Sequence, residues 1–285
     1  MYKEIVSTAS MIAIIITLFI TLIAPVIVWI IYGVKNKGKG VWKALALGAA
    51  GFVLLQMIIR MPILSIVSLL PGFGTFVTNY YVVYCLILAI TAALFEVVAR
   101  FGVAKILQKK INYEQGVAAG LGHGGIEAIL LVGMTYVNNL LYAIMINIGS
   151  FAQMIDESLN SANAGPAVVE QLMAIQASLV EAPSYLFYLA GYERVLTVIF
   201  HTAMSLLVCY LVYKKKALLG VGIAFVVHFL VDFISPLING FAMPYLGSVI
   251  SEGTAYVIIY TFLTVVAIAS LIVIVMIGKK WNAES

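Results

Sequence analysis

Seven ionisable residues lie within stretches of the sequence that are otherwise apolar: Glu96, Arg100, His123, Glu127, His201, His228 and Asp232. They include all three histidines of the chain. Imidazole and carboxylate groups bind zinc through nitrogen and oxygen, and a catalytic zinc site keeps a position open for water. Without a metal, a carboxylate can act as general base on water while neighbouring donors stabilise an oxyanion. Both routes lead to peptide-bond hydrolysis, whereas ion or proton relay in a transporter is a third use.

Six of these residues form pairs four positions apart: Glu96 with Arg100, His123 with Glu127, and His228 with Asp232. Residues at i and i+4 share one face of a helix, so each pair points in one direction. Four glycines surround His123 in "GLGHGG", where they permit close helix approach or room for a ligand. We therefore expect the face that carries His123 and Glu127 to be turned inward.

The composition indicates which elements must position these groups. The chain has 285 residues, of which 64% are hydrophobic and 10% charged, and its mean hydropathy is +1.11. Soluble domains carry about 25% charged residues. The sequence therefore predicts an all-α fold, a polytopic transmembrane helix bundle. Its first apolar run, from about residue 10 to 34, is longer than the ~7–15 residues of a signal peptide and is expected to be a membrane anchor.

Seven segments come close to the ~20 apolar residues that one crossing needs: 10–33, 42–59, 79–101, 116–137, 194–213, 217–237 and 255–278. Lysine clusters follow the first, third, fifth and seventh segments and so fall in alternate loops. By the positive-inside rule the N-terminus lies outside and the C-terminus in the cytoplasm. The net charge of +4 then reflects topology and does not indicate nucleic-acid binding. Cys85 and Cys209 lie in apolar runs and are expected to be reduced core residues.

Two boundaries stay open in the sequence. Apolar residues continue beyond the fourth segment to about Ile148, so 116–149 could be one span or two, and eight spans would invert everything that follows. We expect one span with an extension that breaks near Asn138 and Asn139. The segment from Pro62 to Pro71 is too short to cross and is expected to be re-entrant or interfacial. The long loop 150–192 holds four acidic residues and a candidate amphipathic helix, 167–180.

Depth within the membrane connects the ionisable residues. Glu127, His201 and His228 each lie 12 or 13 residues from the expected cytoplasmic end of their segments. At 1.5 Å per residue this is roughly 18–20 Å, near the middle of the bilayer. His123 lies one turn shallower and Asp232 one turn deeper. We therefore expect separate helices to deliver these groups to one hydrated pocket.

Four stretches on successive spans carry a family resemblance: "FEVVAR" at 95–100, "GLGHGGIEA" at 120–128, "FHTAMS" at 200–205 and "HFLVD" at 228–232. In this order they resemble the YhfC family of bacterial membrane proteins, within the superfamily of type II CAAX prenyl proteases, PrsW proteases and bacteriocin-processing enzymes. The resemblance implies a single membrane domain, 1–285, in the bacterial cytoplasmic membrane. Residues 1–78 would form peripheral spans, 79–240 a CAAX-protease-like four-helix core that includes the loop 150–192, and 241–285 the last span.

The motifs of that superfamily match this sequence residue by residue. Glu96 and Arg100 match the second glutamate and the arginine of the first motif, and Glu127 matches the PrsW-type glutamate of the second. His201 matches the third motif, His228 and Asp232 match the fourth, and His123 is an addition of the YhfC branch. Phe95 stands where the CAAX branch has its first, water-activating glutamate. The resemblance implies that this role passes to Glu127 or Glu96, or is lost.

We interpret the chain as an intramembrane endopeptidase that uses a metal or a glutamate to hydrolyse a peptide in or near the bilayer. Glu127 is the expected base. If zinc is used, the expected ligands are His201, His228, Glu127 and His123; otherwise no cofactor is expected. Asp232 would orient His228, while Glu96 and Arg100 would hold the third span against the site. The alternatives are a non-catalytic membrane scaffold or sorting protein and an ion-coupled transporter.

Overall fold

The structure is a computed structural model that describes residues 5–160 and 165–284. Every regular element in these ranges is a helix. Seven helical stretches are long and apolar enough to cross a membrane: Thr8–Lys35, Val41–Ser68, Tyr81–Lys110, Tyr113–Ile148, Ser184–Tyr213, Ala217–Ala242 and Glu252–Trp281. The predicted polytopic helix bundle is therefore confirmed, with seven spans among the described residues.

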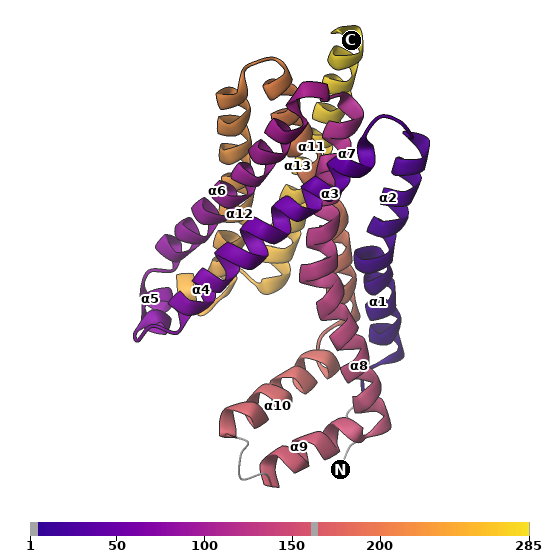
Figure 1. The fold of residues 1–285 in the computed structure, drawn as a ribbon. Helices are drawn as coiled ribbons and strands as arrows, with labels where there is room; N and C mark the ends of the chain where they lie inside the picture. The colour runs from indigo at the N-terminus through magenta and orange to yellow at the C-terminus, as the bar shows by residue number, and fades with distance from the viewer. Residues whose placement is uncertain (1–4, 161–164, 285) are drawn as a thin grey trace. The chain divides into compact units, whose positions relative to one another are not determined.

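Several of these stretches contain more than one element (Figure 1). The α-helices are α1 (Thr8–Leu18), α2 (Ala24–Lys35), α3 (Val41–Phe52), α4 (Met61–Ser68), α5 (Phe73–Asn79), α6 (Tyr81–Leu107), α7 (Tyr113–Glu127), α8 (Met134–Ile148), α9 (Ser150–Asn160), α10 (Pro166–Val180), α11 (Ser184–Tyr213), α12 (Ala217–Ala242) and α13 (Glu252–Glu284). Three π-helical segments join α-helices without a turn: η1 (Phe19–Ile23), η2 (Val53–Arg60) and η4 (Ala128–Gly133). Two short 3₁₀ segments complete the elements of the described residues: η3 (Gln108–Lys110) and η5 (Pro244–Leu246).

The chain divides into two compact units. Unit 1 comprises the chain up to Val26 together with Ala128–Val195, and unit 2 comprises Ile27–Glu127 and the chain from Leu196 onward. The organisation expected from the resemblance, with 79–240 as the core of a single domain, remains a prediction. All seven candidate site residues fall in unit 2.

Glycine allows α7 to pack closely within unit 2. A Cβ atom on Gly122 would lie 2.0 Å from the carbonyl oxygen of Leu45, and one on Gly48 would lie 2.0 Å from that of Ala119. A Cβ on Gly120 would lie 2.4 Å from the Cα of Thr202. No other residue fits such contacts, because they join backbone to backbone. The glycines of "GLGHGG" thus bring α7 against α3 and α11, and the face with His123 and Glu127 is buried, as expected.

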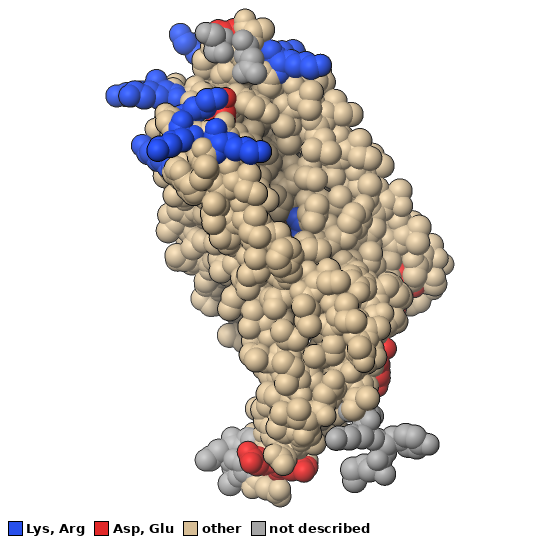
Figure 2. Space-filling view, turned by 90° about the vertical axis from the view of Figure 1, so that its right-hand side faces the viewer, with Lys and Arg blue, Asp and Glu red and all other residues tan. Residues whose placement is uncertain are grey.

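Lysine side chains mark one end of unit 2. Figure 2 shows most of the Lys and Arg side chains gathered together, as the alternation of lysine-bearing loops requires. The helix ends that meet there include those of α2, α6 and α11 and the start of α7, which follow or precede the clusters along the chain. We call this the lysine-bearing end. Its placement in the cytoplasm remains a prediction.

Unit 1 is held by hydrogen bonds between side chains and backbone. Asn147 accepts from the backbone N–H of Val6 at 2.8 Å and donates to the carbonyl of the same residue at 3.1 Å. Thr17 and Tyr136 both donate to the carbonyl of Phe187, at 2.7 and 3.1 Å. The amphipathic helix expected at 167–180 is present as α10, although α9 and the start of α11 make most of the expected loop helical as well.

Two expectations about the spans are wrong. The helix that contains Asn138 and Asn139 does not break there, and its irregular part is the earlier segment η4. Asparagine costs less than about 1 kcal/mol in a helix relative to alanine, so two of them need not end α8. The segment that begins at Pro62 is not a separate re-entrant segment, because α4 continues the helical stretch of the second span to Ser68, and its interfacial placement remains a prediction. Pro62 lies inside this continuous helical stretch, directly after the π-helical segment η2.

Candidate metal centre

The side chain of Glu96 lies at the centre of the site. Its Oε2 atom is 2.9 Å from Arg100 Nη2, 3.1 Å from His123 Nε2, 3.3 Å from His228 Nε2 and 3.5 Å from His201 Nδ1. All of these side chains are buried. Four helices, α6, α7, α11 and α12, therefore meet at a single carboxylate oxygen.

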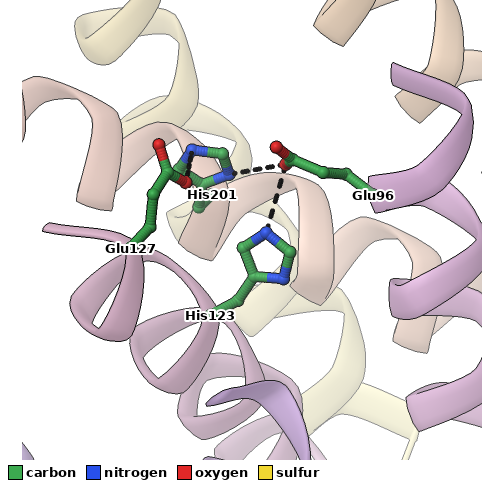
Figure 3. Close-up of side chains that lie close together, drawn as sticks. All are labelled: Glu96, His123, Glu127 and His201. Atoms are coloured by element: carbon green, nitrogen blue, oxygen red, sulfur yellow. Dashed lines mark hydrogen bonds and ion pairs between the residues drawn. The ribbon is translucent and has the colours of Figure 1, made fainter. Parts of the chain in front are cut away.

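The remaining two expected residues join the same group. Glu127 Oε2 lies 2.8 Å from His201 Nε2, and Asp232 Oδ2 lies 3.2 Å from His228 Nε2. Figure 3 shows His201 between two carboxylates, with Glu127 on one ring nitrogen and Glu96 on the other. The structure thus brings together all seven residues singled out in the sequence. We call them the carboxylate–histidine cluster.

Arg100 determines which nitrogen of His201 carries the ring proton in this arrangement. Its Nη2 contacts Nδ1 of His201 at 2.5 Å. A guanidinium only donates, so Nδ1 accepts and the neutral ring carries its proton on Nε2. Nε2 lies 2.8 Å from Glu127 Oε2. Arg100 also donates to Glu96, so one cation orients an imidazole and a carboxylate together.

Two residues of the site were missed in the sequence. The amide nitrogen of Gln56 donates to Glu96 Oε1 at 2.7 Å, and Arg60 Nη1 donates to the amide oxygen of Gln56 at 3.2 Å. Arg60 also donates to Thr91 Oγ1 and to the carbonyl of Leu88 on α6. Gln56 and Arg60 are themselves an i, i+4 pair in an apolar run, which is the signal that would have revealed them. The expected second segment ended at residue 59, one position before the arginine.

The donor chemistry of the cluster fits a metal. One ligand atom from each of Glu96, His123, Glu127 and His201 can be chosen so that all lie within 4.8 Å of one another. Two imidazoles and two carboxylates are a donor set that zinc accepts. A metal shared by Glu96 and His201 would take Nδ1 of His201, which would leave the ring proton on Nε2, beside Glu127 Oε2. This requires Arg100 to withdraw from Nδ1 toward Glu96, which it already contacts.

The geometry differs in one respect from the ligand set expected for zinc. Glu96, expected to hold its helix from outside the site, belongs to the four-residue donor group, whereas His228 does not. His228 contacts Glu96 and Asp232 instead. Asp232 is the most exposed residue of the cluster, with 33% of its side chain accessible. Phe95 is half-buried on α6 beside Glu96 in the chain. The catalytic roles of all these residues remain predictions.

Comparisons with known proteins agree with this picture. A family model described as "YhfC intramembrane metalloprotease" matches residues 16–252. The chain is 34% identical over 128 residues to the "Uncharacterized membrane protein YhfC" of Bacillus subtilis (strain 168). That alignment covers 45% of this chain and 46% of the relative, about half of each protein. No solved structure matches the chain.

The matched region contains every residue of the carboxylate–histidine cluster, together with Gln56 and Arg60. It covers most of the seven apolar spans. The resemblance seen in four short motifs therefore extends over the larger part of the sequence, and the chain belongs to the YhfC intramembrane metalloprotease family.

Proposed function

We propose that this chain is a metal-dependent intramembrane endopeptidase of the bacterial cytoplasmic membrane, with its C-terminus in the cytoplasm. One observation carries the proposal: two imidazoles and two carboxylates approach within 4.8 Å of one another inside helices that are long enough to cross a membrane. Ionisable groups at such a depth are costly and usually serve a function. The description of the family supports the metal-dependent route, and no observation supports the metal-free glutamate route.

A catalytic zinc site keeps three protein ligands and one open position, so one of the four donors must have another role. Both carboxylate oxygens of Glu96 accept hydrogen bonds, Oε1 from Gln56 and Oε2 from Arg100. Glu96 is thus a fixed anion suited to hold a cation. We assign the ligands to Glu96, His123 and His201, and the role of general base to Glu127, which contacts the Nε2 atom of His201.

When bound, the metal would supply a Lewis acid that polarises the scissile carbonyl and makes a water more acidic. Glu127 accepts the proton of the attacking water and then returns it to the leaving amine. His228, placed between Glu96 and Asp232, donates a hydrogen bond to the developing oxyanion. Because Asp232 is the most accessible residue of the cluster, the peptide reaches the site along the face of α12 that bears it.

The test separates binding from catalysis. We expect detergent-purified Glu127→Gln protein to keep about one zinc per chain, measured by mass spectrometry of the metal, and to lose cleavage of fluorescently labelled casein by more than ~100-fold. Glu96→Gln and His123→Ala should lose the zinc. Glu114→Gln is the matched control, since Glu114 is on the same helix and pairs with Lys39 away from the cluster.

Loss of zinc in Glu127→Gln would make Glu127 a ligand and overturn our assignment. Unchanged cleavage by that variant would remove it from the mechanism altogether. Wild-type protein that neither binds zinc nor cleaves would contradict the endopeptidase and leave the cluster as a structural network of a membrane scaffold.

A further inference from the structure

A small internal cavity lies next to the carboxylate–histidine cluster in unit 2. Its volume is about 10 Å³, measured as the space open to the centre of a water molecule. This is close to the room that a single water needs. Three polar side chains line it, those of Arg100, His123 and Ser205, and Cys209 lines it as well.

The polar groups beside this cavity are short of partners. Arg100 uses only its Nη2 atom in the cluster, while its Nε and Nη1 atoms are buried without a hydrogen-bond partner among the described residues. The hydroxyl of Ser205 is also buried without a hydrogen-bond partner among the described residues. Both residues are almost fully buried, at 2% and 3% exposure. Leaving a buried donor unpaired costs about 1–3 kcal/mol, and more for a charged group.

The lining residues show on which side of the cluster the cavity lies. On α6, the cavity is lined by Val103, which lies one turn beyond Arg100 in the direction of Lys105. On α7, it is lined by Ala119, which lies one turn before His123. On α11, Ser205 and Cys209 lie one and two turns beyond His201 toward Lys214. On all three helices the lining residues are displaced from the cluster toward the lysine-bearing end. The cavity is therefore on that side of the cluster.

We propose that this cavity is a binding site for one water molecule, held by Arg100 and Ser205 beside His123. A water has the two donors and two acceptor sites that these groups require, and larger ligands do not fit. His123 contacts Glu96 through Nε2, so its Nδ1 atom is the ring nitrogen left to meet the water. The water site stands whether or not the chain is a hydrolase.

A second part of the inference rests on the proposed function. Hydrolysis consumes one water for each peptide bond, in a region of the bilayer where water is scarce. A water bound one turn from the cluster on the lysine-bearing side is the nearest replacement. Ser205 then acts as a positioning residue, because it holds this water without contacting the substrate.

The two cysteines provide a direct test. Brief X-ray radiolysis converts bound water to hydroxyl radicals, which oxidise the nearest thiol. Cys209 lines the cavity and Cys85 does not, yet both are only 1% exposed. We expect Cys209 of the full chain in detergent to be oxidised at least several-fold faster than Cys85, as measured by peptide mass spectrometry. Equal protection of the two cysteines would overturn the water site.

Substitution of Ser205 gives the second measurement. Ser205→Val fills the cavity and removes the hydroxyl, so Cys209 oxidation should fall to the rate of Cys85. Ser270→Val is the matched control, since Ser270 is equally buried at 3% on α13 and does not line the cavity. Unchanged oxidation of Cys209 in a folded Ser205→Val protein would also overturn the site. If this variant does not fold, the comparison of the two cysteines in the wild type decides.

Measurements of turnover distinguish the water site from its role in supplying water for hydrolysis. Glu127→Gln should keep the fast oxidation of Cys209 although it loses cleavage, so failure of the proposed function leaves the water site intact. Ser205→Val should keep its zinc and lower kcat several-fold with little change in KM. If oxidation falls while kcat is unchanged, the supply role is wrong and the water site stands.

Discussion

The two units use buried polar side chains in opposite ways. In unit 1, Thr17, Tyr136 and Asn147 each hydrogen-bond to the backbone of another segment, and none of these groups is charged. In unit 2, the buried polar groups are mostly ionisable and bond to one another, with Glu96 Oε2 shared by four residues. Neutral hydrogen bonds to backbone stabilise a fold modestly. A buried cluster of charges is weak evidence for stability and stronger evidence for function.

The largest expected effect is the removal of the cation from the cluster. Arg100→Met leaves the carboxylate of Glu96 buried without its strongest donor, and breaking a buried pair in this way costs about 3–5 kcal/mol. We expect a large fall in the thermal unfolding midpoint in detergent. The double variant Glu96→Gln/Arg100→Met should recover part of the loss, because no charge is then left unpaired. A double variant no more stable than Arg100→Met would contradict this account.

Removal of Gln56 should have an intermediate effect. Gln56→Leu deprives Glu96 Oε1 of its donor and the guanidinium of Arg60 of one acceptor, which costs about 1–3 kcal/mol. We also expect weaker zinc binding, since the carboxylate loses its orientation. Zinc affinity by competition with a chelator and the unfolding midpoint are the two measurements. Gln108→Leu, in the exposed segment η3 that follows α6, is the control. Unchanged zinc affinity would make Gln56 a packing residue only.

A smaller effect is expected in unit 1. Thr17→Val removes one of two donors to the Phe187 carbonyl, and Tyr136 still satisfies it. We expect a loss of about 1 kcal/mol and no change in zinc content or cleavage. Thr17→Val/Tyr136→Phe removes both side-chain donors, but the carbonyl stays in the backbone hydrogen-bond ladder of α11, so the double variant should cost about the sum of the single variants. Loss of zinc in either variant would contradict the view that the buried polar side chains of unit 1 serve stability and those of unit 2 serve function.

The smallest effect concerns an exposed pair at the lysine-bearing end. The hydrogen bond from Lys214 to Glu284 raises the pKa of the lysine above its ordinary value. At pH values below the pKa of the lysine in the unfolded state, the raised pKa stabilises the fold. This stabilisation is lost only as the pH rises through the pKa of the lysine in the folded state. We therefore expect Lys214→Gln to lower the unfolding midpoint slightly and by the same amount from pH 6 to 8, because the lysine stays charged throughout this window and exposed pairs contribute little. A large difference, or one that changes across that window, would contradict this account.

The sequence predicted the cluster because depth and face can both be counted along a helix. Glu127, His201 and His228 agree in depth, and the glycines around His123 indicate the inward face. Hydrogen-bond geometry could not be predicted in the same way. Side-chain rotamers and the rotation of four helices against one another decide which oxygen of Glu96 is shared. They also decide that Glu96 belongs to the donor group.

The sequence-based boundaries failed where tertiary packing decides. Gln56 was overlooked because a neutral amide is a weak signal, and Arg60 because the second span was ended too early. Asn138 and Asn139 were expected to end a helix on propensity alone, yet α8 continues through them. Neither η2 nor η4 follows from a residue type, since a π turn arises when packing favours an extra residue in the helix.

The π-helical segment η2 also determines which way the rest of the second span faces. It carries Gln56 and Arg60 on the wide turns that precede α4. Each residue advances a helix by about 100° around its axis. Inserting a further residue at 53–55, where the turns are already wide, would swing the rest of the second span by about that angle, so the amide and guanidinium would leave α6. One added position in the apolar run would thereby disconnect the span from the carboxylate–histidine cluster, and alignments of this family should tolerate substitutions here far better than insertions.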